Sequence, residues 1–183
     1  MKVINGQLKG RNFYMPSGIR PTSNLVRKAV FDVIGQDMEG CSVLELFAGS
    51  GAMGIEAISL GAKQVFIVEN DAKCVSVIRD NMLKLGVDIR LYEISARDAF
   101  ASIKLFDQEG KKFDIIFADP PFSRDLAKKT LKRLGGYDIL HPNSLLVIQH
   151  EKREILPEKE ASLTLIRRKN YGLNTISIYR RCI

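Results

Sequence analysis

The sequence predicts a doubly wound, Rossmann-like α/β fold in which a mostly parallel, seven-stranded sheet carries helices on both faces. Segments with strand character alternate with segments of helical periodicity between residues 43 and 150, and repeated βα units of this kind form parallel sheets. The run 115–118 is continuously apolar, which is typical of a strand buried on both faces. The chain has 183 residues, of which 45% are hydrophobic, so we expect one core and a single domain spanning 1–183.

The individual elements follow from local patterns along the chain. Residues 1–20 hold short β-prone stretches between glycines and predict a hairpin extension ahead of a core at 21–183. A helix capped by Thr22 or Ser23 is expected to run to about Met38. The other predicted strands are 43–47, 65–69, 89–94, 113–118, 144–150, 163–169 and 174–180, and the other predicted helices begin at 52 or cover 72–85, 96–104 and 124–134. The last two strands are expected to form an antiparallel hairpin at the sheet edge.

A turn of unusual chemistry, Asp119-Pro120-Pro121-Phe122, ends the strand 113–118. Neither proline can donate to a strand ladder, so the pair predicts a stiff turn at the carboxyl end of the strand, where open α/β sheets bind ligands. The Asp119 carboxylate and the Pro120 carbonyl are acceptors, and Phe122 offers a flat ring. This set suits a planar base with an exocyclic amine. The alternative is an acid that merely ends a strand, with prolines for stiffness.

A second motif, ELFAGSGAMG at 45–54, predicts a strand that enters a glycine-rich turn and then a helix. The missing side chains let the backbone approach a ligand, and free helix N–H groups favour negative charge. Gly49, Gly51 and Gly54 also match the dinucleotide fingerprint, so a nicotinamide cofactor is an alternative. Glu45 favours an ammonium group instead, because a carboxylate would sit badly beside a pyrophosphate.

An acid, Glu69, ends the second predicted strand, where such folds bind the ribose hydroxyls of an adenosine. The alternative is a solvated acid that caps the helix beginning near Asp71. The third strand ends at 94–100, close to the expected place of an adenine, and Arg97 or Asp98 is a candidate contact there.

The net charge of +7 favours a polyanionic partner. Basic residues gather in three places, although some belong to the solvated faces of helices. The candidate phosphate contacts are Arg11, Arg20 and Arg27 near the N-terminus, Arg124, Lys128, Lys129 and Lys132 after the proline turn, and Arg167, Arg168 and Lys169 near the C-terminus.

No membrane segment is expected, because no apolar run has transmembrane length and no signal peptide is recognisable. Cys41, Cys74 and Cys182 are odd in number and lack metal-ligand spacing, so we interpret them as thiols of a cytoplasmic protein and predict no metal.

Taken in order, the motifs resemble those of a known family. GIRPTSNLVRKAVFDVI, ELFAGSGAMGIEA, IVEND, ADPPF and RRKNYGLNTISIYR together are similar to the bacterial RsmD-type methyltransferases of 16S ribosomal RNA, and the resemblance covers Val3 to Arg181. It implies a class I methyltransferase fold, S-adenosyl-L-methionine as cofactor and methylation of the exocyclic N2 of a guanine. It also implies 16S rRNA of the small ribosomal subunit as the substrate. Because the basic surface around the turn is small, we expect the protein to act as a monomer on the small ribosomal subunit or an assembly intermediate rather than on naked RNA. The implied cofactor contacts are Glu45, Phe47, Gly49, Gly51 and Glu69, and the implied base contacts are Asp119, Pro120, Pro121 and Phe122. We add Ser50, Asn70 and Arg97 as further candidate cofactor contacts.

Other classes of function remain open at this point. An amino-methyltransferase acting on DNA adenine N6, on another RNA or on a protein would use the same DPPF turn. A dinucleotide-binding Rossmann protein or a non-catalytic RNA-binding module would use the same fold.

Overall fold

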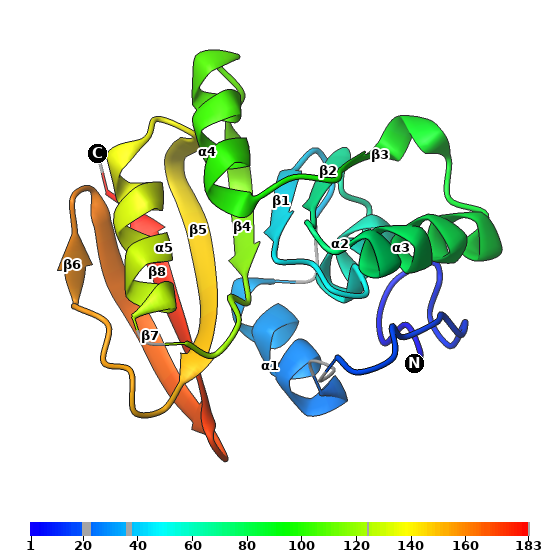
Figure 1. Ribbon diagram of the computed structural model, residues 1–183, viewed down its shortest axis with the longest axis horizontal. Coiled ribbons are helices and arrows are strands. Elements are labelled where there is room, and N and C mark those ends of the chain that lie inside the picture. Colours follow the sequence, from blue (N-terminus) through cyan, green and yellow to red (C-terminus); the bar gives the residue numbers. More distant parts are fainter. Residues whose placement is uncertain (20–22, 36–37, 124, 183) are drawn as a thin grey trace.

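A single eight-stranded sheet organises the computed structural model of the chain, which describes residues 1–19, 23–35, 38–123 and 125–182 (Figure 1). The strands are β1 (Ser42–Leu46), β2 (Gln64–Val68), β3 (Tyr92–Ser95), β4 (Phe113–Ala118), β5 (Leu140–Glu151), β6 (Lys159–Glu160), β7 (Leu163–Tyr171) and β8 (Asn174–Arg181). Their order in the sheet is β3-β2-β1-β4-β5-β8-β7-β6. Strands β1 to β5 pair in parallel, and β8, β7 and β6 continue the sheet antiparallel. The predicted parallel sheet with a C-terminal antiparallel hairpin is confirmed, and the two-residue β6 is an addition to it.

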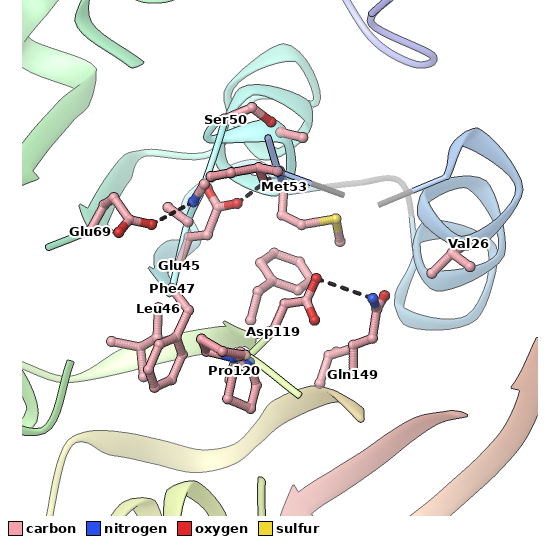
Figure 2. Close-up of a pocket in the computed structure, with 18 of the residues that line it drawn as sticks. Val26, Glu45, Leu46, Phe47, Ser50, Met53, Glu69, Asp119, Pro120 and Gln149 are labelled. Carbon is pink, nitrogen blue, oxygen red and sulfur yellow. Dashed lines mark hydrogen bonds between the residues drawn. The ribbon is translucent and has the colours of Figure 1, made fainter. Parts of the chain in front are cut away.

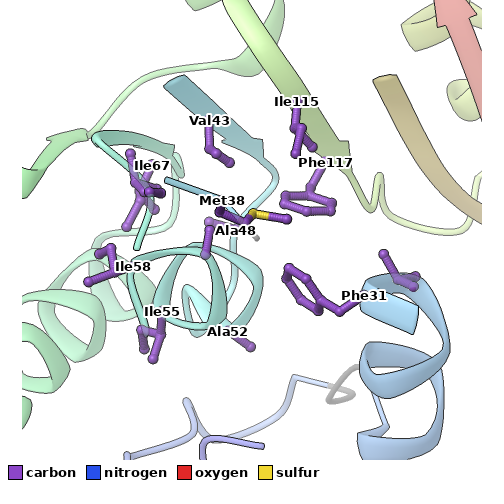
Figure 3. Packing of buried hydrophobic residues seen from close by; sticks show 14 of the residues in the cluster. Phe31, Met38, Val43, Ala48, Ala52, Ile55, Ile58, Ile67, Ile115 and Phe117 are labelled. Carbon is purple, nitrogen blue, oxygen red and sulfur yellow. The ribbon is translucent and has the colours of Figure 1, made fainter. Parts of the chain in front are cut away.

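Helices cover both faces of this sheet. They are α1 (Asn24–Ile34), α2 (Ala52–Ser59), α3 (Ala72–Leu85), α4 (Ala99–Gln108) and α5 (Leu126–Gly136). Buried residues of α1, α2 and α3 share one core with Val43, Ile67 and Phe117, whereas those of α4 and α5 share the other with Leu44, Val68 and Ala118. Neighbouring strand residues therefore face opposite cores, as the pleat of a strand requires. Figure 3 shows the first core, where the ring centroids of Phe31 in α1 and Phe117 in β4 are 5.6 Å apart.

Several predicted boundaries differ from the structure, among them the start of β5, which begins at Leu140 and not at residue 144. Three of the differences have a local reason. The first helix ends at Ile34 and not at Met38, because Gly35 has a φ of 98° and leaves the helix. The fourth helix begins at Ala99, because the Asp98 side chain accepts a hydrogen bond from the helix and caps it. Residues 89–91 form a short 3₁₀ helix, η1 (Ile89–Leu91), so that only 92–95 belong to the strand.

The N-terminal residues form a two-armed loop rather than a regular hairpin, since Lys2 and Asn12 make a single antiparallel bridge. Val3 and Phe13 are each only 2% exposed and belong to the same core as α1 to α3. Among the described residues no helix is long and apolar enough to cross a membrane.

A buried ion pair connects α1 to α2, and its two side chains also bind the backbone of the N-terminal loop. Arg27 and Glu56 are both 0% exposed, with 2.9 Å between Nη1 and Oε1. Arg27 also donates to the Lys2 carbonyl, and Glu56 accepts from the N–H groups of Ile4 and Asn5. The interpretation of Arg27 as a phosphate contact is therefore wrong, because its guanidinium lies inside the protein and is bound there.

We predict that Arg27→Met lowers the free energy of unfolding by about 3–5 kcal/mol, because it leaves the Glu56 carboxylate buried without its partner. Chemical denaturation measures this change. Lys28→Met is the matched control: Lys28 forms an exposed pair with Asp32, so its removal should change stability by no more than about 0.5 kcal/mol. An Arg27→Met variant with unchanged stability but weakened RNA binding would contradict the structural role.

Candidate active site

One cavity of about 450 Å³ lies at the carboxyl ends of the parallel strands (Figure 2). It adjoins the point between β1 and β4 where the strand order reverses, the usual ligand site of open α/β sheets. The cavity brings together most of the residues predicted from the motifs, namely Glu45, Phe47, Gly49, Ser50, Glu69, Asn70, Asp119, Pro120, Pro121 and Phe122. Gly51 follows Ser50 in the same turn.

Glu45 occupies the end of β1 and holds the start of α2. Its carboxylate accepts hydrogen bonds from the N–H groups of Met53, at 3.1 Å, and Gly54, at 2.8 Å. A Cβ at Gly54 would lie 2.8 Å from Glu45 Oε2, so only glycine lets the helix approach the acid this closely. Burial raises the pKa of Glu45 to about 8, and the nearby charges of Asp119 and Glu69 act in the same direction.

This arrangement disfavours the dinucleotide alternative. A pyrophosphate binds free N–H groups at the start of a helix, but the Glu45 carboxylate already accepts from two of those groups in α2. Glu69 and Asp119 line the same cavity, and a cation beside Glu45 would favour the ionised form of its carboxyl group, so the cavity is suited to a cation rather than to a phosphate. The donor set fits a ligand that carries an ammonium or a sulfonium group.

Glu69 holds the opposite side of the glycine-rich turn. One oxygen accepts from the Gly49 N–H at 2.7 Å, and the other accepts from Asn70 at 2.8 Å and Asp71 at 2.9 Å. Asp71 itself caps α3, so the alternative in which Glu69 caps that helix does not hold. A carboxylate oxygen has two acceptor sites, which leaves one site on Glu69 Oε2 for a ligand hydroxyl.

The turn between these two acids is conformationally unusual. Phe47 has a φ of 57°, in the left-handed region that a bulky side chain rarely adopts. Its ring packs edge-on against Phe100, with 6.3 Å between the centroids. Gly49 and Gly51, with φ of 57° and 73°, complete the turn without such strain.

Asp119 lies across the cavity from the two glutamates (Figure 2). Gln149 donates a hydrogen bond from Nε2 to Asp119 Oδ2 at 3.1 Å. Phe122, which is 40% exposed, lies at the cavity rim, where its ring is accessible to a base. The turn thus presents the acceptors and the apolar ring that its sequence predicts.

Sequence reasoning missed part of the cavity wall. Gln149 lies near the carboxyl end of β5, beside Asp119, which directly follows β4. It stands inside the predicted strand 144–150, so the attention given to acids at strand ends passed over it. Val26 and Val30 of α1 and Met15 of the N-terminal loop form another side of the cavity. Their positions depend on how α1 packs, which no local pattern encodes.

Some predicted contacts lie elsewhere. Arg97 is exposed and is not among the residues that line the cavity, so the structure does not support its assignment to the cofactor. Arg11 donates to the carbonyls of Leu85 and Lys84 and thereby caps the end of α3, so we no longer assign it to phosphate. Arg20 and Arg124 lie outside the described residues. The α5 lysines are exposed, as a phosphate contact requires: Lys128, Lys129 and Lys132.

Known proteins are similar to this chain over nearly its whole length. Residues 1–180 match the family described as "Conserved hypothetical protein 95". The putative rRNA methyltransferase YlbH of Bacillus subtilis is 32% identical over 183 residues, which is 99% of each chain. Ribosomal RNA small subunit methyltransferase D of Escherichia coli K12 is 31% identical over 185 residues, covering 99% of this chain and 90% of that protein.

Solved structures agree with this result. The putative methyltransferase yhhF from Escherichia coli superimposes with a TM-score of 0.86 at 29% identity, covering 100% of this chain and 98% of that one. The putative methylase HI0767 from Haemophilus influenzae gives 0.83 at 26% identity, with coverages of 100% and 98%. The chain therefore has a class I methyltransferase fold and belongs to the family that matches residues 1–180, the RsmD-type family that its motifs resemble.

Proposed function

We propose that the protein methylates the exocyclic N2 of a guanine in a loop of 16S ribosomal RNA, with S-adenosyl-L-methionine as the methyl donor. The observation that carries this proposal is the shared cavity, in which Glu45 and Glu69 face the Asp119-Pro120-Pro121-Phe122 turn. Relatives named as rRNA methyltransferases support the substrate class.

The cavity fits this cofactor in charge and form. Glu69 is suited to a ribose hydroxyl, and Glu45 offers a buried carboxyl group that a bound ammonium group would ionise. Phe47 and Gly49 border the remaining surface. When bound, S-adenosylmethionine supplies an electrophilic methyl group on a sulfonium. The negative wall attracts that cationic form and gives less attraction to the product, which has lost the sulfonium charge.

The proline turn would orient the amine. The N2 of guanine is a weak nucleophile, because its lone pair is delocalised into the ring. Hydrogen bonds from its N–H groups to the Asp119 carboxylate and the Pro120 carbonyl would favour a pyramidal nitrogen and direct its lone pair into the cavity. Asp119 would also stabilise the positive charge that develops on nitrogen and accept the released proton. Phe122 would stack on the flipped base.

We predict that Glu69→Ala weakens S-adenosylmethionine binding by about 1.5–3 kcal/mol, because a charge-assisted hydrogen bond to the ribose is lost. Isothermal titration calorimetry measures the change, and RNA binding should stay nearly intact. Glu93→Ala is the control, since this acid on the neighbouring β3 forms only a partly exposed pair with Lys111. Unchanged cofactor affinity in a folded Glu69→Ala variant would contradict the assignment of Glu69 to the ribose of the cofactor.

We predict that Asp119→Ala keeps cofactor and RNA affinity but lowers the single-turnover methylation rate by about 10²–10³-fold, because a preorganised acceptor is lost where charge develops. Rapid-quench assays with labelled cofactor measure the rate. Asp125→Asn is the control: it changes an exposed acid beyond the turn and should leave the rate unchanged. A near wild-type rate for Asp119→Ala would refute the catalytic role.

The substrate form follows from the small RNA-binding surface. The chain has no separate RNA-binding domain among its described residues, so phosphate contacts must come from surfaces such as the exposed lysines of α5. We therefore infer that the protein acts as a monomer on a protein-organised small subunit or assembly intermediate. In such a particle the target loop is already splayed, which removes an ordering cost.

The proposed function is tested by methylating small subunits and naked 16S rRNA at identical salt and mapping the modified nucleoside by mass spectrometry. We expect N2-methylguanosine at one site, formed much faster in the particle than in naked RNA. Methylation of an adenine would contradict the assignment of guanine as the target base. Equal rates on both substrates would contradict the assignment of the particle as the preferred substrate. If neither substrate is methylated, the proposed function is wrong.

A further inference from the structure

A shallow groove between α1 and the β7–β8 hairpin adjoins the main cavity. It is lined by the apolar side chains of α1 and by Arg167, Lys169 and Tyr171 of β7. Val30 and Ile176 line both the groove and the main cavity, so the two lie side by side. The groove therefore borders the proposed active site on the side of the β7–β8 hairpin.

The strand register connects the two sites residue by residue. Gln149, which binds Asp119, is paired with Ile176 in β8, and Ile176 is paired with Lys169 in β7. Side chains of paired residues lie on the same face, so this row runs from the DPPF turn to a cation two strands away. Paired Cα atoms in antiparallel strands are about 4.5–5.5 Å apart, which puts Lys169 roughly 10 Å from Gln149. That separation is within the reach of a nucleotide next to the target base.

The charges of β7 are divided between its two faces. Arg167 pairs with Ile178 and Lys169 with Ile176, so both belong to the face covered by α1. Arg168 belongs to the other face, where Nη2 donates to the Leu156 carbonyl at 2.6 Å. Both Arg167 and Lys169 are exposed, and no acidic residue lines the groove in the part of the chain that the structure describes.

An aromatic ring completes the groove. The Lys169 ammonium lies 5.3 Å from the centroid of the Tyr171 ring. Cations along a backbone track, beside an aromatic ring on which a base can stack, are the combination that binds single-stranded nucleic acid. In Figure 1 the turn after Tyr171 lies at the end of the sheet to which the arrows of β1 and β4 point.

We propose that this groove binds the single-stranded RNA segment that flanks the target nucleotide, with Arg167 and Lys169 on its phosphates and Tyr171 against a flanking base. The proposal rests on the proposed function, because it takes the RNA in the main cavity as given. It assigns substrate positioning to the α1 face of the hairpin and excludes Arg168 from that role.

The test compares two double variants that each remove two positive charges. Arg167→Ala with Lys169→Ala changes the groove. Lys63→Ala with Lys104→Ala is the control, because Lys63 precedes β2 at the opposite end of the sheet and Lys104 lies on α4, on the other face. Methylation of small subunits is measured over a range of salt, together with cofactor affinity and thermal unfolding.

We expect the groove variant to raise KM for the particle roughly ten-fold at physiological salt. The slope of log affinity against log salt should fall by about 1.4, which corresponds to two lost phosphate contacts on a single strand. Its kcat, its cofactor affinity and its unfolding temperature should match those of the wild type, and the control should keep the wild-type KM and slope.

Equal effects of the two double variants would overturn the proposal, because the charges would then act only through the net field. A fall in kcat with unchanged KM would overturn it as well. If the wild-type protein itself fails to methylate rRNA while binding the cofactor, the proposed function fails and not the groove assignment alone. Binding of a labelled single-stranded RNA to the wild type and to the groove variant then tests the groove independently: equal affinities refute it.

Discussion

The site depends on one buried carboxylate, that of Glu45. It lies 4% exposed at the end of β1 and accepts hydrogen bonds from the first turn of α2. This contact fixes the glycine-rich turn between strand and helix, requires a glycine at Gly54 and removes the helix terminus as an anion site. The same backbone pattern that binds pyrophosphate in dinucleotide enzymes is thereby converted into part of a cation-attracting cavity. In this chain Glu45 is the side chain that makes the helix start unsuitable for a pyrophosphate.

Charge in this protein is separated between the inside and the outside of the site. The cavity holds Glu45, Glu69 and Asp119, whereas the chain as a whole carries a net charge of +7. A cationic cofactor and a polyanionic substrate have opposite requirements, and both have to be met at one site. Burying the acids at the strand ends and exposing the bases on α5 and β7 satisfies both requirements, since solvent screens the outer charges from the inner ones.

Much of the fold and of the site could be predicted from the sequence, because both follow from where apolar runs end. Parallel strands bring their carboxyl ends to one edge, so the acids that end β1, β2 and β4 had to meet there. Arg27 was misassigned, because a charged residue on a helix carries no local sign of burial. Its partner Glu56 lies on another helix, and only tertiary packing joins them. The prediction that Arg97 binds the cofactor was not supported for a similar reason. The end of a parallel strand tells where the following loop lies, but not which side chain of that loop enters the cavity.

The position of the DPPF turn between two basic surfaces limits which nucleic acid fits. Lys128 and Lys129 belong to α5 on one face of the sheet, and Arg167 with Lys169 belongs to the opposite face. A nucleic-acid strand that touches both sets of basic residues would pass over the carboxyl ends of the parallel strands. The exposed ring of Phe122 lies there, at the cavity rim. A duplex resists so tight a bend, because its persistence length is about 150 base pairs, whereas a single-stranded loop bends freely. The geometry therefore favours a single-stranded segment over a duplex, and it does so through shape and charge.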